Sequence, residues 1–341
     1  MKKSLMTLGV LALFVLMAYG QEKKFALYSV AFYNMENLFD TIHDEGKNDY
    51  EYLPNGTNQW NTMKYKAKLK NMSEILSLLS TDKLPMGPAI IGVSEIENYR
   101  VLEDILKQPA LADRGYRYVH YEGEDQRGVD CAFFYNPKLF ELTNSKLVPY
   151  VYINDTVHKT RGFLIASGNI AGEKMHFIVN HWPSRAATSP ARERAGEQVR
   201  AIKDSLLKED SAAKIVIMGD MNDDPMDKSM AVALGAKRKP ADVGPTDLYN
   251  PWWDTLKKGY GTLMYKGKWN LFDQIVFTGN LLGTDRSTLK FYKHEIFSRD
   301  FMFQKEGKYK GYPKRTQAGG VWLNGYSDHL PTIIYLIKEV K

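Results

Sequence analysis

The chain has 341 residues, of which 44% are hydrophobic and 25% are charged, and this ordinary composition excludes a disordered or fibrous protein. The formal net charge of +6 suits a polyanionic substrate without identifying one. Cys131 is the single cysteine, so no intrachain disulfide can form. Its apolar neighbours at 132–135 indicate a buried small side chain rather than a nucleophile.

The first twenty residues have the pattern of a secretory signal. Lys2 and Lys3 precede an apolar run over residues 5–17, and small side chains just after it predict cleavage before Gln21. Cleavage would remove two positive charges and leave a net charge of +4. An uncleaved anchor is the alternative, although the run is short for a membrane span. Residues 1–20 are therefore predicted to be a signal peptide, and the mature protein is expected to be periplasmic or secreted, with no stable membrane anchor.

Eight apolar runs predict β-strands in the mature chain. They cover residues 26–33, 89–93, 129–135, 163–170, 175–180, 214–218, 272–277 and 332–337. Apolar residues at helical spacing predict helices over 62–80 and 191–207. Some successive strands are separated by a helix and others only by a turn, which favours mixed sheets over a purely parallel sheet. Residues 21–341 show no repeat and no break in composition, and they are expected to form one domain.

Two polar side chains, Asp220 and Asn222, follow the predicted strand at 214–218. Their spacing of two residues lets both point to the same side of a tight loop. A carboxylate can activate a water molecule, and an amide can donate to a phosphate oxygen. The alternative is an ordinary turn, because Asp, Asn and Gly all favour turns.

Two histidines lie at other strand ends. His181 follows the run at 175–180, and Asp328 and His329 precede the run at 332–337. A histidine can act as a general acid or base near neutral pH, particularly beside a carboxylate. Each motif also has a structural alternative, since a lone strand-end histidine or an Asp-His pair often has no catalytic role.

A metal ligand is predicted just after the strand at 89–93. Glu95 ends this buried run, and Mg²⁺ typically takes one or two protein carboxylates together with water and substrate phosphate. Glu97 is the alternative ligand, although a solvated loop position is expected for it.

The order of these residues along the chain is more specific than any one motif. Together they resemble the endonuclease/exonuclease/phosphatase superfamily, in the branch that includes pancreatic deoxyribonuclease. The matching blocks run from Phe32 to Leu330 and comprise Asn34, Glu95, His181, Gly219-Asp220-Met221-Asn222, Asp273 and Ser327-Asp328-His329. The resemblance implies an α/β (α+β) four-layer sandwich, with two mixed β-sheets packed face to face, helices outside and the site at one edge.

The resemblance also implies a divalent-metal site. Glu95 corresponds to the principal ligand, Asn34 braces the site, and Asp328 is a further residue expected at the metal. Mg²⁺ or Mn²⁺ is the expected cofactor, and Ca²⁺ is a further candidate as a supporting ion. Three other carboxylates either hold a second cation or cap turns: Glu36, Asp223 and Asp224.

The implied reaction is in-line attack of water on a phosphodiester. Asp220 and Asn222 orient the water, and Asn222 donates to the charge that develops on the phosphate. His329, oriented by an aspartate, takes the proton of the water and His181 protonates the leaving oxygen, or the two histidines exchange these roles.

Five further residues support this catalytic set. Asp273 matches the aspartate carried on a strand in the family, and Asp328 belongs to the closing Asp-His pair. Asp130 is expected to orient the first catalytic histidine. Arg161 and Arg185 are expected to bind phosphate oxygens bidentately, with ordinary surface arginines as the alternative.

An exported endonuclease that hydrolyses DNA, or RNA, is the favoured interpretation, with nucleic acid as its substrate. Basic stretches at 64–70 and 237–239 could contact phosphates, and Trp182, Trp252 and Trp253 could stack on bases. The alternatives are a solvated helix face for the lysines and core packing for the tryptophans. The rival function is a phosphodiesterase or phosphatase acting on lipid head groups or small phosphate esters. A monomer without an obligatory protein partner is expected.

Overall fold

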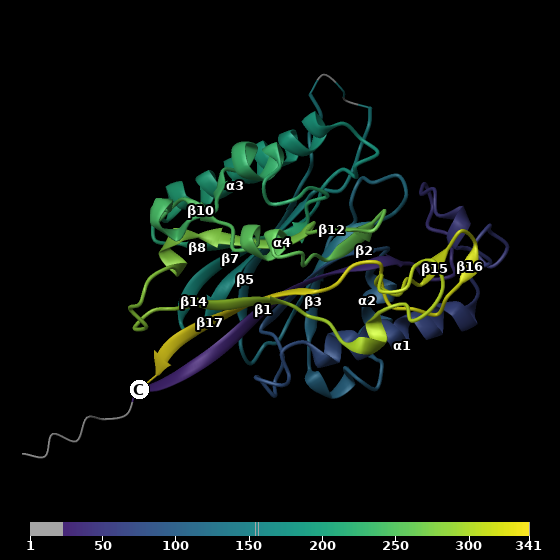
Figure 1. Cartoon of the computed structure of the whole chain (residues 1–341), viewed down its shortest axis with the longest axis horizontal. Coiled ribbons are helices and arrows are strands. Elements are labelled where there is room, and N and C mark those ends of the chain that lie inside the picture. The colour runs from purple at the N-terminus through teal and green to yellow at the C-terminus, as the bar shows by residue number, and fades with distance from the viewer. Residues whose placement is uncertain (1–22, 154, 156, 341) are drawn as a thin grey trace, which may run out of the picture.

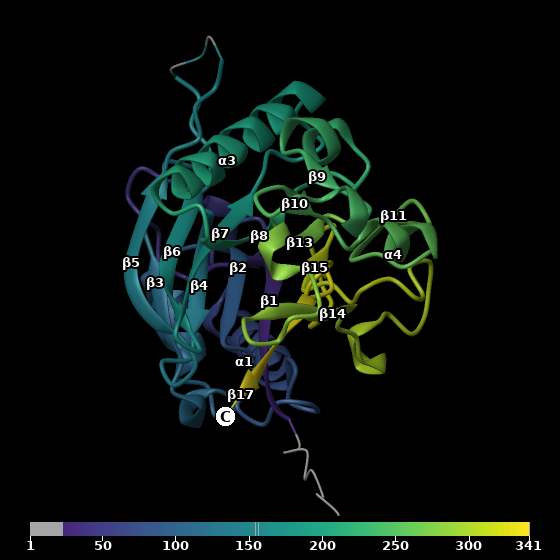
Figure 2. The same ribbon diagram turned by 90° about the vertical axis from the view of Figure 1, so that its left-hand side faces the viewer.

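A computed structural model describes residues 23–153, 155 and 157–340 (Figure 1). Two large mixed sheets pack face to face, and helices cover the outer surface of each (Figure 2). The predicted four-layer sandwich is therefore confirmed. The predicted signal peptide at 1–20 lies outside the described residues, so export stays a prediction.

The first sheet has six strands, and only one neighbouring pair in it, β1 with β2, is parallel. In spatial order the strands are β14 (Lys290–Ile296), β17 (Thr332–Val340), β1 (Lys24–Leu38), β2 (Ile90–Ile96), β4 (Asp130–Tyr135) and β3 (Arg117–His120). Its outer face is covered by two helices: α1 (Thr62–Leu78) and α2 (Tyr99–Leu106).

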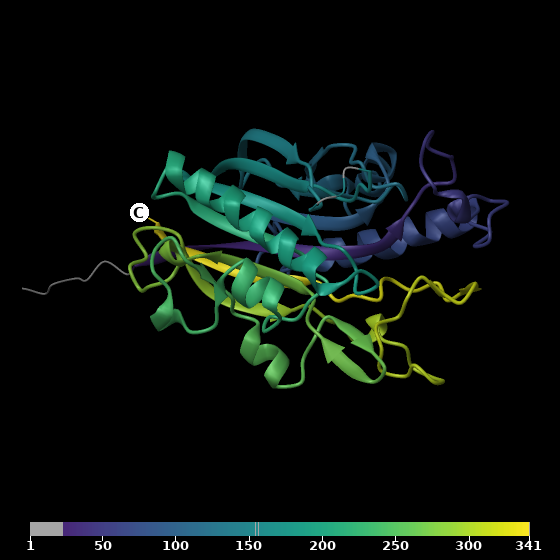
Figure 3. The ribbon, with the colours of Figure 1, turned by 90° about the horizontal axis from the view of Figure 1, so that it is seen from above.

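The second sheet has seven strands, of which β7 and β8 form the central parallel pair. In spatial order the strands are β5 (Glu141–Val148), β6 (Phe163–Ile170), β7 (Glu173–His181), β8 (Lys214–Asp220), β13 (Asp273–Thr278), β10 (Leu248–Tyr249) and β9 (Ala236–Lys237). Its outer face packs against the long helix α3 (Ser189–Glu209), which Figure 3 shows crossing the strands.

The second half of the chain adds smaller elements outside the two large sheets. They are a short helix and two hairpins: α4 (Trp253–Lys257), β11 (Leu263–Tyr265) with β12 (Lys268–Asn270), and β15 (Gln317–Ala318) with β16 (Val321–Trp322). Single helical turns complete the described elements: Tyr50–Tyr52, Ala112–Arg114, Ser229–Ala233, Pro240–Asp242, Gly279–Leu281 and Asp300–Met302.

All eight predicted strands and both predicted helices are present, with ends shifted by a few residues. The sequence pattern missed the edge strands β5 and β14, whose segments ELTNSKLV and KFYKHEI carry charged and polar residues throughout. Edge strands bury little of either face, so they lack the continuous apolar run that identifies the central strands.

Side-chain alternation divides each central strand between two cores. On β7, Phe177 and Val179 point between the sheets, whereas Ile178 packs against the helix layer. On β8, Met218 lies between the sheets in the same way. Because successive side chains alternate, the next inward positions, His181 and Asp220, also face the other sheet. The inter-sheet core therefore leads directly into the polar strand ends.

No helix in the described ranges 23–153 and 157–340 is long and apolar enough to cross a membrane.

Gly219 is required where β7 and β8 approach each other. A Cβ at this position would lie 2.3 Å from the backbone oxygen of Asn180, which cannot rotate away. Gly219→Ala should therefore lower the free energy of unfolding by about 1–3 kcal/mol, as overpacked cores do. Urea unfolding measures this, with the exposed Ser211→Ala as a control expected to stay within about 0.5 kcal/mol of wild type. An unchanged Gly219→Ala would show that the strand pair tolerates wider spacing.

Candidate active site

The pairing of strands in the second sheet places three candidate side chains next to one another in a row. His181 on β7 pairs with Asp220 on β8, and Asp220 pairs with Asp273 on β13. Residues directly opposite one another on paired strands point to the same face, so all three face the first sheet. All three side chains are buried. The second sheet therefore presents a histidine and two carboxylates at one edge.

The first sheet contributes Asn34 and Glu95 to the same place. Ile91 and Val93 on β2 face the helices, so strict alternation would turn Glu95 outward as well. The ladder shifts between Ser94 and Ile96, and Glu95 has a φ of 58°. This bulge turns its carboxylate inward, where Oε1 accepts a hydrogen bond from Nδ2 of Asn34 at 3.0 Å. A bulge commonly redirects a side chain at an active site.

Asn34 lies between the two carboxylates of the site. Its Nδ2 donates to Glu95 Oε1 and to Asp220 Oδ2, at 3.0 Å in each case. Its Oδ1 accepts from the backbone nitrogen of Glu36 at 2.8 Å. Asn34 therefore holds the two carboxylates together while its own oxygen accepts a backbone hydrogen bond.

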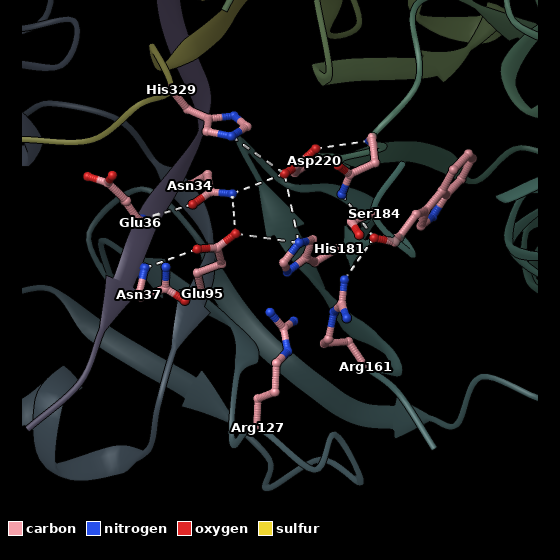
Figure 4. A network of polar contacts seen from close by, with 12 residues as sticks. Asn34, Glu36, Asn37, Glu95, Arg127, Arg161, His181, Ser184, Asp220 and His329 are labelled. Atoms are coloured by element: carbon pink, nitrogen blue, oxygen red, sulfur yellow. Dashed lines mark hydrogen bonds and ion pairs between the residues drawn. The ribbon is translucent and has the colours of Figure 1, made fainter. Parts of the chain in front are cut away.

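His329 enters from the segment that precedes β17. Its Nδ1 lies 2.7 Å from Asp273 Oδ2, so Asp273 is the aspartate that orients this histidine. That contact directs Nε2 toward Asp220, 3.9 Å from Oδ2. His181 approaches the same oxygen with its Nε2 at 3.8 Å (Figure 4). Two histidines thus converge on one carboxylate oxygen.

The surroundings move the pKa values of the two histidines in opposite directions. Burial lowers the pKa of His181 well below its usual range, and Arg161, Arg127 and His329 add to this effect. Burial opposes the charged form of His329 too, but the carboxylates of Asp273, Asp220 and Asp328 outweigh it and hold its pKa well above the usual range. In this charge state, His329 carries a proton near pH 7 and His181 is neutral.

The pKa of Asp220 is raised to about 7 by burial and by the neighbouring carboxylates of Asp273 and Glu95, with His329 opposing. Ligand atoms of Glu95, His181 and Asp220 lie within 4.8 Å of one another, and those of Asp220, Asp273 and His329 do so as well. Apart from the histidines, only a neutral amide joins Glu95 to Asp220 in the described part of the chain. This oxygen-rich, negatively charged donor set fits a hard divalent cation.

Asp130 does not orient His181 as expected. Its Oδ2 lies 3.2 Å from His120 Nε2 and accepts from the backbone nitrogen of Gly123. His120 pairs with Ala132 on the adjacent strand, which makes it the diagonal neighbour of Asp130 on one face. Nδ1 of His181 has no hydrogen-bond partner among the described residues.

The two arginines expected at the phosphate are occupied by protein groups. Arg161 is buried, pairs with Asp125 at 3.1 Å and donates to the carbonyl of Trp182. Arg185 pairs with three carboxylates and stacks on a phenylalanine ring: Asp223, Asp224, Asp227 and Phe272. Asp223 and Asp224 thus hold arginines, which leaves no need for a second cation at these two positions.

Asn222 and Asp328 are close to the site but engaged with neighbours. Asn222 has a φ of 52°, and its Nδ2 donates to the carbonyl of Trp182 at 3.0 Å. Asp328 pairs with Arg315 at 3.0 Å through one of its carboxylate oxygens. The catalytic roles of the residues that do converge stay predictions.

Several side chains that were expected to contact nucleic acid or solvent are buried. Trp182 and Trp252 lie in the hydrophobic cores, so they cannot stack on bases. Lys68 lies inside the protein near Glu36, although Lys66 and Lys70 are exposed. Glu97 is buried rather than solvated, and its carboxylate accepts from the backbone nitrogen of Asp40.

Arg127 and Asn37 were missed by the sequence analysis. Arg127 points toward Glu95 and His181 (Figure 4), and 53% of its side chain is exposed. Its one ion pair within the described residues is with Asp125, at 3.4 Å. The backbone nitrogen of Asn37 donates to Glu95 Oε2 at 3.0 Å. Neither position carries a local signal, because each is an ordinary loop residue until the fold brings it to the site.

A two-sheet sandwich with histidines and carboxylates converging at one edge is the arrangement of a metal-dependent phosphoesterase. A family model described as "Endonuclease/Exonuclease/phosphatase family" matches residues 29–338. The chain belongs to this family, whose members are phosphoesterases that depend on a divalent metal.

Solved structures share the fold at low sequence identity. An endonuclease/exonuclease/phosphatase family protein from Bacteroides thetaiotaomicron has a TM-score of 0.58 at 14% identity, covering 93% of this chain and 97% of that chain. A mannosyl-6-phosphatase from the same bacterium has a TM-score of 0.56 at 14% identity, covering 91% and 99%. Humanised D. rerio TDP2 has a TM-score of 0.55 at 14% identity, covering 91% and 98%. Comparison with curated proteins finds no match.

Replacing Asp273 should reveal the charge of His329. A group whose pKa is higher in the folded state than in the unfolded state stabilises the folded protein at pH values below its unfolded-state pKa. This contribution is lost as the pH rises through the folded-state pKa. In EDTA, Asp273→Asn should therefore lower the free energy of unfolding by about 3 kcal/mol below pH 6, with the deficit shrinking at alkaline pH. Urea unfolding across this range measures the deficit.

The exposed Asp113→Asn is the matched control and should show no pH-dependent deficit. A deficit for Asp273→Asn that is equal at all pH values would contradict a protonated His329.

Proposed function

We propose that this protein hydrolyses phosphodiester bonds in nucleic acid, DNA foremost, by in-line attack of water with Mg²⁺ or Mn²⁺ as cofactor. The observation that carries the proposal is the convergence of His181 and His329 on Asp220, with Glu95 in the same cluster. Two proton-transferring groups on separate strand ends suit a reaction that must deprotonate a water and protonate a leaving oxygen.

The chain supplies the groups for each proton transfer. Asp220, with a pKa near neutrality, orients the attacking water. Neutral His181 can accept a proton, and His329 holds one that its Nε2 can donate, while Asp273 fixes the other ring nitrogen. This is the second of the two assignments that the sequence left open. A divalent cation held by Glu95 and Asp220 would neutralise charge on the phosphate.

Phosphate recognition is assigned to Arg127 in place of Arg161 and Arg185. The latter two are committed to carboxylates and carbonyls, whereas most of the guanidinium hydrogen-bonding capacity of Arg127 remains available beside Glu95. A guanidinium in this position can bind two phosphate oxygens at once. The positive net charge and exposed Lys66 and Lys70 support a polyanionic substrate.

A phosphodiesterase or phosphatase acting on small phosphate esters is the second candidate. It is favoured by the burial of Trp182 and Trp252, which removes two of the three tryptophans expected to stack on bases. It also agrees with a large cavity beside the site, which could hold a small organic group.

Purified protein with Mg²⁺ or Mn²⁺ should degrade plasmid DNA or oligonucleotides, and EDTA should abolish the activity. His181→Ala and His329→Ala should each reduce turnover about 100- to 10,000-fold, because each removes a proton-transferring group. His158→Ala is the matched control, since that histidine is exposed and pairs only with Asp155 in the described residues. Wild-type turnover in either site variant would remove the proposed mechanism.

Bis-p-nitrophenyl phosphate and p-nitrophenyl phosphate belong in the same assay. Cleavage of these small esters without cleavage of DNA or RNA would reject the nuclease proposal and favour the second candidate.

Metal binding can be tested without turnover. Mg²⁺ at 100 times its dissociation constant should stabilise the wild-type protein by about 2.7 kcal/mol, which appears as a rise in Tm. Glu95→Gln should lose most of this rise because it removes a ligand charge, whereas the exposed Glu141→Gln should keep it. Equal rises in all three proteins would place the cation elsewhere.

A further inference from the structure

A cavity of about 1190 Å³ opens beside the candidate active site. It shares Glu36, Asn37 and Asp328 with the surroundings of that site. Asn37 also donates its backbone hydrogen bond to Glu95, so the cavity reaches the residue next to the predicted metal ligand. Its walls are the loop at 51–58, the β11–β12 hairpin and the segment 304–323, which Figures 1 and 3 show extending beyond the sheet edge.

Aromatic side chains gather in this cavity in two groups. Tyr52 and Trp60 come from the first loop, with ring centroids 5.9 Å apart. Tyr265 comes from the hairpin. Tyr309 and Tyr312 come from the segment that follows β14, and their ring centroids lie 5.4 Å apart. The backbone nitrogen of the hairpin residue Gly267 donates to the Tyr312 hydroxyl at 2.6 Å, which ties these two walls together.

Two of these rings are unusually open to solvent. Tyr265 is 63% exposed and Tyr309 is 52% exposed, although both line a cavity. A lysine ammonium, that of Lys266 or Lys308, lies over each ring, and a flat ligand can stack on a ring that faces a cavity. Trp182 and Trp252 lie in the cores and cannot provide such a surface, whereas these two tyrosines line the cavity and face solvent.

The charges that line the cavity do not suit a chain of phosphates. Its lining includes four acidic and three basic side chains: Glu36, Glu51, Glu306, Asp328, Lys266, Lys308 and Arg315. Glu36 and Asp328 are both paired with Arg315, so these charges largely cancel one another. A polyanionic backbone requires a surplus of positive charge, which this lining lacks. The cavity is therefore suited to the uncharged part of a substrate whose phosphate lies at Glu95.

The polar groups and apolar walls of the cavity match the chemistry of a base. Amides of Asn58, Gln304 and Gln317 line the cavity, and each offers both a donor and an acceptor, as the edge of a base requires. Leu263 and Leu323 add apolar surface to the five aromatic rings. A nucleoside can use both features, since its base offers flat faces for stacking and an edge of donors and acceptors.

We infer that this cavity receives an unpaired nucleoside next to the scissile phosphate, so that the preferred substrate is single-stranded nucleic acid or an unpaired strand end. In a duplex, the faces of a base are stacked and its edge is paired, so the base must leave the helix before it can enter a cavity. The inference rests on the proposed nuclease function and specifies its substrate class.

The first test compares cleavage of matched oligonucleotides. The wild-type enzyme should have a kcat/KM at least tenfold higher on a single strand than on the duplex. Tyr265→Ala and Tyr309→Ala should each reduce kcat/KM on the single strand about tenfold, mainly through KM, because each removes one stacking face. Neither variant should change cleavage of an oligonucleotide that carries abasic spacers around one phosphodiester.

Tyr292→Ala is the matched control, since Tyr292 is 53% exposed on β14 and does not line the cavity. It should behave as wild type on every substrate. Duplex preference in the wild type, or an equal loss on the abasic substrate for the two cavity variants, would overturn the inference while leaving the nuclease function intact.

A second test measures binding in the cavity in the absence of catalysis. Protein in EDTA is titrated with deoxynucleoside 5′-monophosphates and with sugar phosphates, and tyrosine and tryptophan fluorescence is recorded. Saturable quenching by the nucleotides, lost in Tyr265→Ala and Tyr309→Ala but kept in Tyr292→Ala, supports the nucleoside site even if no nucleic acid is cleaved. Binding of sugar phosphates in preference to nucleotides would overturn it.

Discussion

Two strands of one sheet end where a third begins, and their register brings His181, Asp220 and Asp273 into a single row. The row depends on the close approach of β7 and β8, where a glycine leaves no room for a Cβ. Every other contact of the site is built on it. Asn34 reaches Asp220 from the opposite sheet, and His329 is oriented by Asp273. A shift of one residue along either strand would turn these side chains to the helix face.

The site concentrates negative charge among largely buried side chains. Glu95, Asp220 and Asp273 lie close together, and the side chains that contact them include one neutral amide and two histidines. The raised pKa of Asp220 and the opposite displacements of the two histidine pKa values follow from this crowding. Such a site suits a cation and a phosphate bound together, because the cation offsets the repulsion between the carboxylates and the phosphate.

A buried charge network joins the site to the neighbouring cavity. Glu36 accepts hydrogen bonds from Arg315 and from the backbone of Thr316, and Lys68 approaches it to 3.9 Å. Burial raises the pKa of Glu36 to about 6 and lowers that of Lys68 to about 8, so the pair is retained at a cost in stability. The same Arg315 pairs with Asp328, beside His329. The wall of the cavity is thus held at a defined position relative to the catalytic groups.

Apolar runs that end in polar residues were enough to predict the central strands, the two long helices and the strand-end positions of Asn34, His181 and Asp220, because alternation and helical spacing are local properties. The order of the motifs then identified the family. Tertiary structure alone decided the partner of Asp130, the burial of Trp182 and the position of Arg127 beside Glu95. These depend on contacts between segments far apart in the chain, and the inward turn of Glu95 depends on a bulge at a backbone angle that the sequence pattern does not reveal.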